Sequence, residues 1–218
     1  MRLNITLILF LATTCAFTQP RFELGVFGQY EFDLPSMRSF QSKGISPGVQ
    51  AGMVLEYPNR TIHVYLSGRW EAFRERTGEV FLFGFGMKEE LLLDNLVVGP
   101  GLMVRLAKNR RIQPLLGLEI FIGIPLRTRY EMVRTEDLSF LFLPEYWQAD
   151  GGALFQAGTY FFTGLSSRIT NETYWELKLG MGHGTQTFNW NSVHPVDLEQ
   201  FLLTGWYASA RLGLTKRF

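Results

Sequence analysis

Three histidines, at positions 63, 183 and 194, are the side chains best suited to metal binding or to proton transfer near neutral pH. Zinc enzymes use ligands at short, recognisable spacings such as HExxH, and no such spacing occurs in this chain. The strand pattern predicts His63 near one end of the molecule and His183 and His194 near the other. We therefore expect no metal site, no cofactor and no shared histidine centre.

Cys15 is the only cysteine, and it lies in a segment, residues 1–19, that has the layout of a secretory signal peptide. Arg2 supplies the positive start, residues 5–12 form a short apolar stretch, and small residues follow. That stretch is shorter than the ~20 residues a membrane-spanning helix needs. We expect removal of this segment on export. The mature chain, residues 20–218, would then lack a disulfide, a thiolate metal site and a cysteine nucleophile.

Ionic side chains in the rest of the chain occur at alternate positions, opposite apolar ones. Six carboxylates and four cations share this phase: Glu23, Glu31, Glu56, Glu71, Glu119, Glu176, Arg69, Arg105, Lys178 and Arg211. The formal net charge of the chain is only +1, and there is no long basic run, so nucleic acid is not expected as a partner. What these charges can do depends on the elements that carry them.

Eight segments show the alternation of apolar and polar residues that is typical of strands with one apolar face. They cover residues 21–32, 47–57, 61–73, 94–107, 112–126, 152–165, 173–184 and 206–218. Each reaches the ~9–11 residues that a membrane-spanning strand needs, whereas strands of ordinary globular proteins usually have about 5–6. After residue 19, no apolar run is long enough for a membrane-spanning helix.

The connections between these segments alternate strictly between short and long. Those between the second and third, fourth and fifth, and sixth and seventh segments are short, and the other four are long. A transmembrane barrel with both ends in the periplasm has this arrangement, because its periplasmic turns are tight and its external loops are longer. We therefore predict an all-β fold for residues 20–218, an eight-stranded antiparallel up-and-down transmembrane β-barrel.

In such a barrel the apolar faces contact lipid and the polar faces line the lumen. Leu118, Ile120 and Ile122 should then point outward and Glu119 inward. An eight-stranded lumen is just wide enough for its own side chains, and unpaired charges there are costly. We predict a cross-barrel salt-bridge network that plugs the lumen, with solvation at the rim as an equal alternative for Glu31 and Glu71. Its members would be Glu23, Glu56, Arg69, Glu71, Arg105, Glu119, Glu176, Lys178 and Arg211.

The last segment, "WYASARLGLTKRF", resembles the C-terminal strand of bacterial outer-membrane β-barrels, which usually finish on an aromatic residue. Leu212, Leu214 and Phe218 carry this resemblance, and Lys216 departs from it. The resemblance implies recognition by the barrel-assembly machinery and pairing of this strand with 21–32. The whole mature chain is similar to small eight-stranded barrels of the OmpA/OmpX kind and to Bacteroidota-type outer-membrane barrel families. This implies a Gram-negative cell envelope and outer-membrane lipid as a partner.

The function that we expect is a non-catalytic integral outer-membrane barrel with a structural, accessory or docking role. Two external stretches, 79–86 and 138–147, are unusually apolar. They could be strands continuing above the bilayer, a docking surface for another envelope protein, or an added strand pair that makes ten strands.

Two alternatives come from other classes of protein. Some small outer-membrane barrels are lipid A deacylases with a His-x-Ser element. The nearest match here is His183 with Thr185 and either Asp197 or Glu199, in which threonine is a poor replacement for the serine nucleophile. The second alternative is a secreted soluble barrel that binds a small apolar ligand.

Overall fold

The computed structural model describes residues 20–32, 45–76, 80–82, 85–134, 146–150, 153–188 and 201–218. The predicted signal segment, residues 1–19, lies outside this set and stays a prediction. Ten strands are present: β1 (Arg21–Phe32), β2 (Ile45–Glu56), β3 (Arg60–Arg76), β4 (Val80–Leu82), β5 (Phe85–Leu106), β6 (Ile112–Arg134), β7 (Tyr146–Asp150), β8 (Ala153–Arg168), β9 (Thr173–Phe188) and β10 (Phe201–Arg217). Among the described residues, no helix is long and apolar enough to cross a bilayer.

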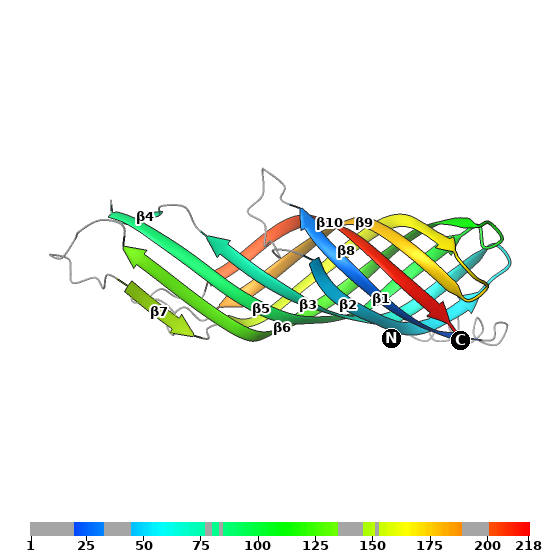
Figure 1. Cartoon of the computed structure of the whole chain (residues 1–218), viewed down its shortest axis with the longest axis horizontal. Coiled ribbons are helices and arrows are strands. Elements are labelled where there is room, and N and C mark those ends of the chain that lie inside the picture. The colour runs from blue at the N-terminus through cyan, green and yellow to red at the C-terminus, as the bar shows by residue number, and fades with distance from the viewer. Residues whose placement is uncertain are drawn as a thin grey trace, which may run out of the picture.

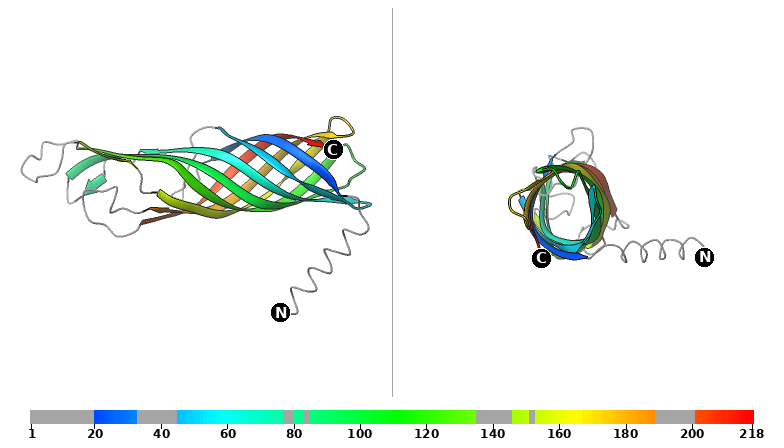
Figure 2. Two further views of the ribbon diagram at one scale, coloured as in Figure 1. Left: turned by 90° about the horizontal axis from the view of Figure 1, so that it is seen from below. Right: turned by 90° about the vertical axis from the view of Figure 1, so that its right-hand side faces the viewer.

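Eight of the strands close into a barrel, in the ring order β1-β2-β3-β5-β6-β8-β9-β10. Every neighbouring pair is antiparallel, and β1 pairs with β10 from Glu23↔Arg217 to Phe32↔Ala208 to complete the ring. The end-on view in Figure 2 shows this closed ring. Closure pairs the backbone groups of the wall with one another, as a sheet surrounded by hydrocarbon requires. The predicted eight-stranded antiparallel barrel is confirmed.

β4 and β7 belong to the sheet but not to the ring. β4 pairs only with the start of β5, and β7 pairs only with the end of the wall strand β6, at Arg129–Val133. The two apolar external stretches therefore contribute strands above the barrel, and the alternative of a ten-stranded barrel is wrong. Residues 138–145 of the second stretch lie outside the described residues.

β5 and β6 are 22 and 23 residues long and run well beyond the predicted segments 94–107 and 112–126. Figure 1 shows these two strands extending past the other strands of the ring at the left, where β4 and β7 also lie. The ladder between the two strands shifts register at Asp94/Asn95. A bulge of this kind breaks the two-residue side-chain period although the backbone pairing continues. The sequence pattern therefore stops at the bulge while the strands do not.

The three short connections, residues 57–59, 107–111 and 169–172, lie at one end of the barrel, which we call the turn end (Figure 1). The other ends of the wall strands lie at the opposite end of the barrel, which we call the loop end. Ala107 has φ 55° in the second turn, where its carbonyl accepts a hydrogen bond from the Arg110 N–H at 2.8 Å. The sorting of connections by length, predicted from the sequence, is confirmed.

The wall has an apolar outside and a charged inside. Ile120 and Ile122 are 53% and 54% exposed, whereas the opposite face of the same strand carries Glu119 with no exposed surface. The same inversion holds for Phe22, Leu24 and Val26 of β1, which are all exposed. An apolar exterior of this extent suits a hydrocarbon environment. It contradicts the secreted soluble alternative, which needs an apolar interior.

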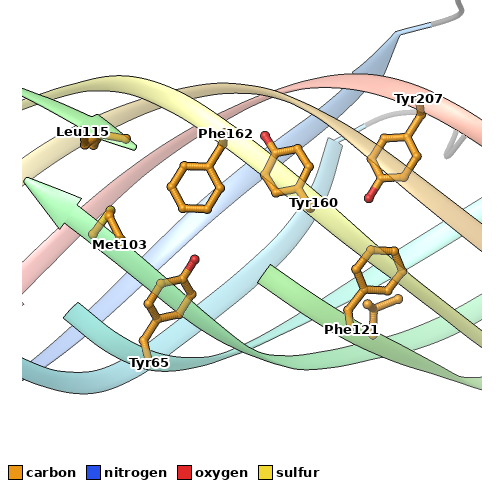
Figure 3. Packing of buried hydrophobic residues seen from close by; sticks show 8 residues of the cluster. Tyr65, Met103, Leu115, Phe121, Tyr160, Phe162 and Tyr207 are labelled. Atoms are coloured by element: carbon orange, nitrogen blue, oxygen red, sulfur yellow. The ribbon is translucent and has the colours of Figure 1, made fainter. Parts of the chain in front are cut away.

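Aromatic side chains also fill the lumen. Figure 3 shows the buried cluster, whose members are Tyr65, Val97, Met103, Leu115, Phe121, Tyr160, Phe162 and Tyr207. Some of the rings pack against a glycine of the neighbouring strand. A Cβ at Gly182 would overlap the Tyr207 ring, and one at Gly101 would overlap the Tyr65 ring. In the described residues, the lumen is therefore filled by a mixture of charged side chains and rings.

Candidate functional site in the charged lumen

Glu119 of β6 lies at the centre of the buried ionic groups. Its Oε1 accepts a hydrogen bond from Arg69 Nη1 of β3 at 2.8 Å, and its Oε2 accepts one from Arg211 Nη1 of β10 at 2.9 Å. The Tyr65 hydroxyl donates a longer bond to Oε2, at 3.4 Å. One carboxylate thus links three strands that are far apart in the sequence. Two guanidinium groups compensate its charge away from water.

The two cations around Glu119 have further partners toward the loop end. Arg69 Nε donates to Glu71 at 2.7 Å. Arg211 donates from Nε and Nη2 to the Gln29 side-chain oxygen, at 2.9 and 2.7 Å, and Gln29 donates to Glu31 at 3.0 Å. Glu31 and Glu71 are both buried. They are therefore part of the lumen interior and not solvated rim groups.

A second buried cluster forms around Arg105 of β5, closer to the turn end. Arg105 donates to Glu23 of β1 at 3.0 and 3.2 Å and also contacts Glu176 of β9. Lys178 Nζ lies 3.0 Å from the other oxygen of Glu176 and 3.2 Å from the Gln50 side-chain oxygen. Cations and carboxylates alternate through this cluster, so each buried charge has an opposite neighbour.

His63 joins this second cluster, although it was not among the predicted network residues. Its Nδ1 lies 3.3 Å from Glu23, and its Nε2 lies 3.0 Å from the Thr61 hydroxyl. The two-residue period of the strand does predict this direction. Ile62 and Val64 share the outward phase, so His63 between them must point inward with Thr61. Among the described residues, no three His, Cys, Asp or Glu side chains are grouped as a metal site requires.

Glu56 has no direct contact with the carboxylates and cations of the two buried clusters described above, and among the described residues only Arg217 connects it to Glu23. Glu56 lies at the turn end, with its carboxylate 2.6 Å from Lys108 Nζ and 2.7 Å from Arg217 Nη1. Neither cation was among the predicted network residues. Arg217 could have been found from its phase in β10, two positions after Thr215. Lys108 could not, because it lies in a turn where strand alternation predicts nothing.

The buried cations also stack on aromatic rings. The guanidinium carbon of Arg211 lies 4.3 Å from the Phe27 ring centre and 5.3 Å from that of Tyr160. Arg69 lies 4.9 Å from Phe121 in the same way. A planar, weakly hydrated guanidinium can be desolvated against a ring at lower cost than an ammonium group. Alternation predicts that these rings point inward, but not which cation each one contacts.

Of the residues of the deacylase alternative, only His183 and Thr185 lie in the described part of the chain. His183 and Thr185 share the outward-facing phase of β9 with Met181, which is exposed. The His183 ring lies 4.9 Å from that of Trp206, edge to face. Asp197, Glu199 and His194 lie outside the described residues.

The C-terminal residues lie where β1 and β10 close the barrel. Leu212, Leu214 and Phe218 are exposed on the outer face. The Phe218 N–H donates to the carbonyl of Phe22 at 2.8 Å, and the two rings lie 6.4 Å apart. The end of the chain is therefore held against its first strand at the turn end.

A solved outer-membrane protein has a similar fold. The chain is similar to a major outer membrane protein from Thermus thermophilus, with a TM-score of 0.55 and 10% identity over 92% of this chain and 100% of that chain. Lower scores relate it to OprG from Pseudomonas aeruginosa (TM-score 0.43, 10% identity, 92% and 96% covered) and to Neisserial surface protein A (0.42, 12%, 91% and 97%). No protein-family model matches the chain, and no curated protein matches it.

This is the fold of a small outer-membrane β-barrel. The first of these similarities and the closed eight-stranded ring confirm the predicted resemblance at the level of fold. The apolar exterior of the outer-membrane barrel agrees with a location in the bacterial outer membrane. The narrower likeness to Bacteroidota-type families stays a prediction.

Proposed function

We propose that this outer-membrane barrel is a non-catalytic, non-conducting protein with a structural or accessory role in the cell envelope. The observation that carries the proposal is the burial of Glu119 between Arg69 and Arg211. Side chains from β3, β6 and β10 meet there across the lumen. A second layer, in which Arg105 joins Glu23 and Glu176, crosses the lumen nearer the turn end.

The space left between these layers supports a closed lumen. The cavity beside Glu23, Gln50, His63 and Tyr65 has a volume of about 10 Å³. That is close to the smallest space that holds one water molecule. Diffusion pores of outer membranes use about 16–18 strands, twice the number in this ring.

The accessory role that we propose is docking of another envelope protein at the loop end. The long hairpin of β5 and β6 supports this proposal. Both strands have more than 20 residues, whereas about 9–11 suffice to span the membrane. The excess length, flanked by β4 and β7, provides a small sheet beyond the barrel.

Single-channel recording in planar lipid bilayers tests the closed lumen. The wild-type barrel should give no conductance steps. A triple variant that removes the central layer should give small conductance steps. It combines Arg69→Ala, Glu119→Ala and Arg211→Ala. Stable conductance of the wild-type protein would overturn the proposal.

We also propose that the barrel-assembly machinery recognises Leu212, Leu214 and Phe218. Phe218→Ala and Phe22→Ala form a matched pair, since the two exposed rings are neighbours at the same rim. Phe218→Ala should lower the amount of folded barrel in cells several-fold, and Phe22→Ala should not. Equal losses would instead mean that the rings matter only for packing.

A further inference from the structure

A cavity of about 180 Å³ occupies the turn end of the barrel. Arg21 of β1, Lys108 of the second turn, Arg168 of β8 and Arg217 of β10 line it, together with Glu56 and Tyr174. It is far larger than the spaces deeper in the lumen. No role assigned above to the lumen or to the loop end uses it.

The ionic groups in the lining of this mouth cavity are unbalanced. Glu56 is its only carboxylate, and it already lies within 4 Å of Lys108, Arg217 and Arg21. The four cations therefore leave three positive charges without compensation from the lining. Deeper in the lumen, by contrast, cations and carboxylates alternate closely.

Two of the cations, Arg217 and Arg168, have side-chain N–H donors without an acceptor among the described residues. Arg217 is 95% buried, and its Nε has no hydrogen-bond partner among the described residues although its terminal nitrogens contact Glu56 and Glu23. Arg168 is exposed, and its side chain forms no ion pair with any residue in the described ranges. A buried donor without a partner costs free energy, so an acceptor bound beside Arg217 Nε would be stabilising.

The mouth cavity is closed on its inner side. Beyond it lie Arg105, with no exposed surface, and the buried Glu23 and Glu176 that pair with it. A ligand must therefore enter and leave from the turn end. A small solute fits this shape, and a threaded polymer does not.

The surroundings of the cavity are basic as well. Arg60, Arg110, Arg111 and Lys216 lie on the same rim, where Glu172 is the only further acidic side chain of the turns and strand ends. A concave site lined by one sign of charge concentrates ligands of the opposite sign. The rim therefore favours anions approaching from the periplasm.

We propose that the mouth cavity binds a phosphate group or a similarly charged tetrahedral oxyanion. Arginine presents a planar fork of N–H donors that matches the oxygens of such an anion, and arginines come from several sides here. The volume is sufficient for a phosphate with several waters, since one water occupies about 30 Å³ in the liquid. The phosphate could belong to a soluble periplasmic solute or to a lipid headgroup of the inner leaflet. This site is independent of the docking role at the loop end.

Isothermal titration of the purified barrel in zwitterionic detergent with inorganic phosphate tests the proposal. Saturable binding should weaken with added salt, and Arg168→Gln should lower the affinity at least 10-fold. Arg111→Gln is the matched control, because it removes a charge from the same rim outside the cavity lining, and it should change the affinity less than 2-fold. Arg217→Gln should resemble Arg168→Gln. If the Arg217→Gln variant does not fold, the phosphate affinity of the Arg168→Gln variant still tests the proposal.

Lipid nanodiscs separate the two sources of phosphate. Phosphatidylglycerol should compete with inorganic phosphate if the headgroup occupies the cavity. If the natural ligand is a solute, the affinity for inorganic phosphate should be the same in nanodiscs that contain phosphatidylglycerol and in nanodiscs of pure phosphatidylcholine. Either result retains the phosphate site. Absence of saturable binding, or equal losses in Arg168→Gln and Arg111→Gln, would overturn it.

Discussion

Glu119 and Ile120 are adjacent in the sequence and lie on opposite faces of one strand. The carboxylate has no exposed surface, and the isoleucine is 53% exposed. In a water-soluble barrel the two environments would be exchanged. The difference shows that the surrounding medium decides which face is apolar. The charged face is tolerable only because Arg69 and Arg211 complete its pairing.

The largest expected effect comes from breaking the inner face. Glu119→Ala leaves Arg69 and Arg211 buried with no carboxylate between them. Removing one partner of a buried ion pair typically costs about 3–5 kcal/mol, because the remaining charge stays desolvated. We expect a loss of this size in the free energy of unfolding, measured by reversible denaturation in lipid vesicles. A loss below about 1 kcal/mol would mean that water reaches these arginines.

A charge placed on the outer face tests the other half of the comparison. Ile120→Lys puts an ammonium group against hydrocarbon and should cost about 2–4 kcal/mol if the residue lies near the bilayer midplane. The matched control is Ile112→Lys, at the exposed first position of the same strand near the turn end. A cation near the interface costs about 0–1 kcal/mol. Equal costs at both sites would contradict a bilayer midplane that lies nearer Ile120 than Ile112.

A smaller effect should follow from crowding the lumen. Gly182→Ala places a methyl group against the Tyr207 ring, and overpacking typically costs about 1–3 kcal/mol. Gly184 lies on the same face of β9, and the atom nearest to a methyl group at that position would be 3.8 Å away, so Gly184→Ala should cost little. Thermal unfolding followed by gel mobility compares the two variants. Indistinguishable midpoints would show that the ring moves aside freely.

The smallest effect is expected at the mouth of the lumen. Glu56 is partly exposed, and its contacts with Lys108 and Arg217 are open to salt. Partly exposed ion pairs contribute about 0–1 kcal/mol and weaken with ionic strength. Glu56→Gln should therefore lower the free energy of unfolding by about 1 kcal/mol or less at low salt, and by a smaller amount at high salt. A salt-independent loss would indicate that this carboxylate is as desolvated as Glu119.

Strand alternation is a local property, and it predicts which face of each strand is apolar. The eight-stranded transmembrane ring followed only when strand length, the alternation of short and long connections and the C-terminal strand were added. The phase of the strand alternation also predicts that Phe27, His63 and Arg217 point inward. It could not give the length of β5 and β6, because the register shift at Asp94/Asn95 interrupts the period. Nor could it pair Glu56 with Lys108, since a turn residue has no strand phase.

By itself, the sequence determined the class of fold, the sidedness of the wall and the end at which the short turns lie. These follow from a two-residue period and from connection lengths, which need no knowledge of distant residues. Only the tertiary structure decided which charges meet, because Glu119, Arg69 and Arg211 become neighbours through ring closure across 50 and 92 positions of sequence. It also decided that Arg21, Lys108, Arg168 and Arg217 surround one cavity, since strand tilt and turn geometry bring them to the same mouth.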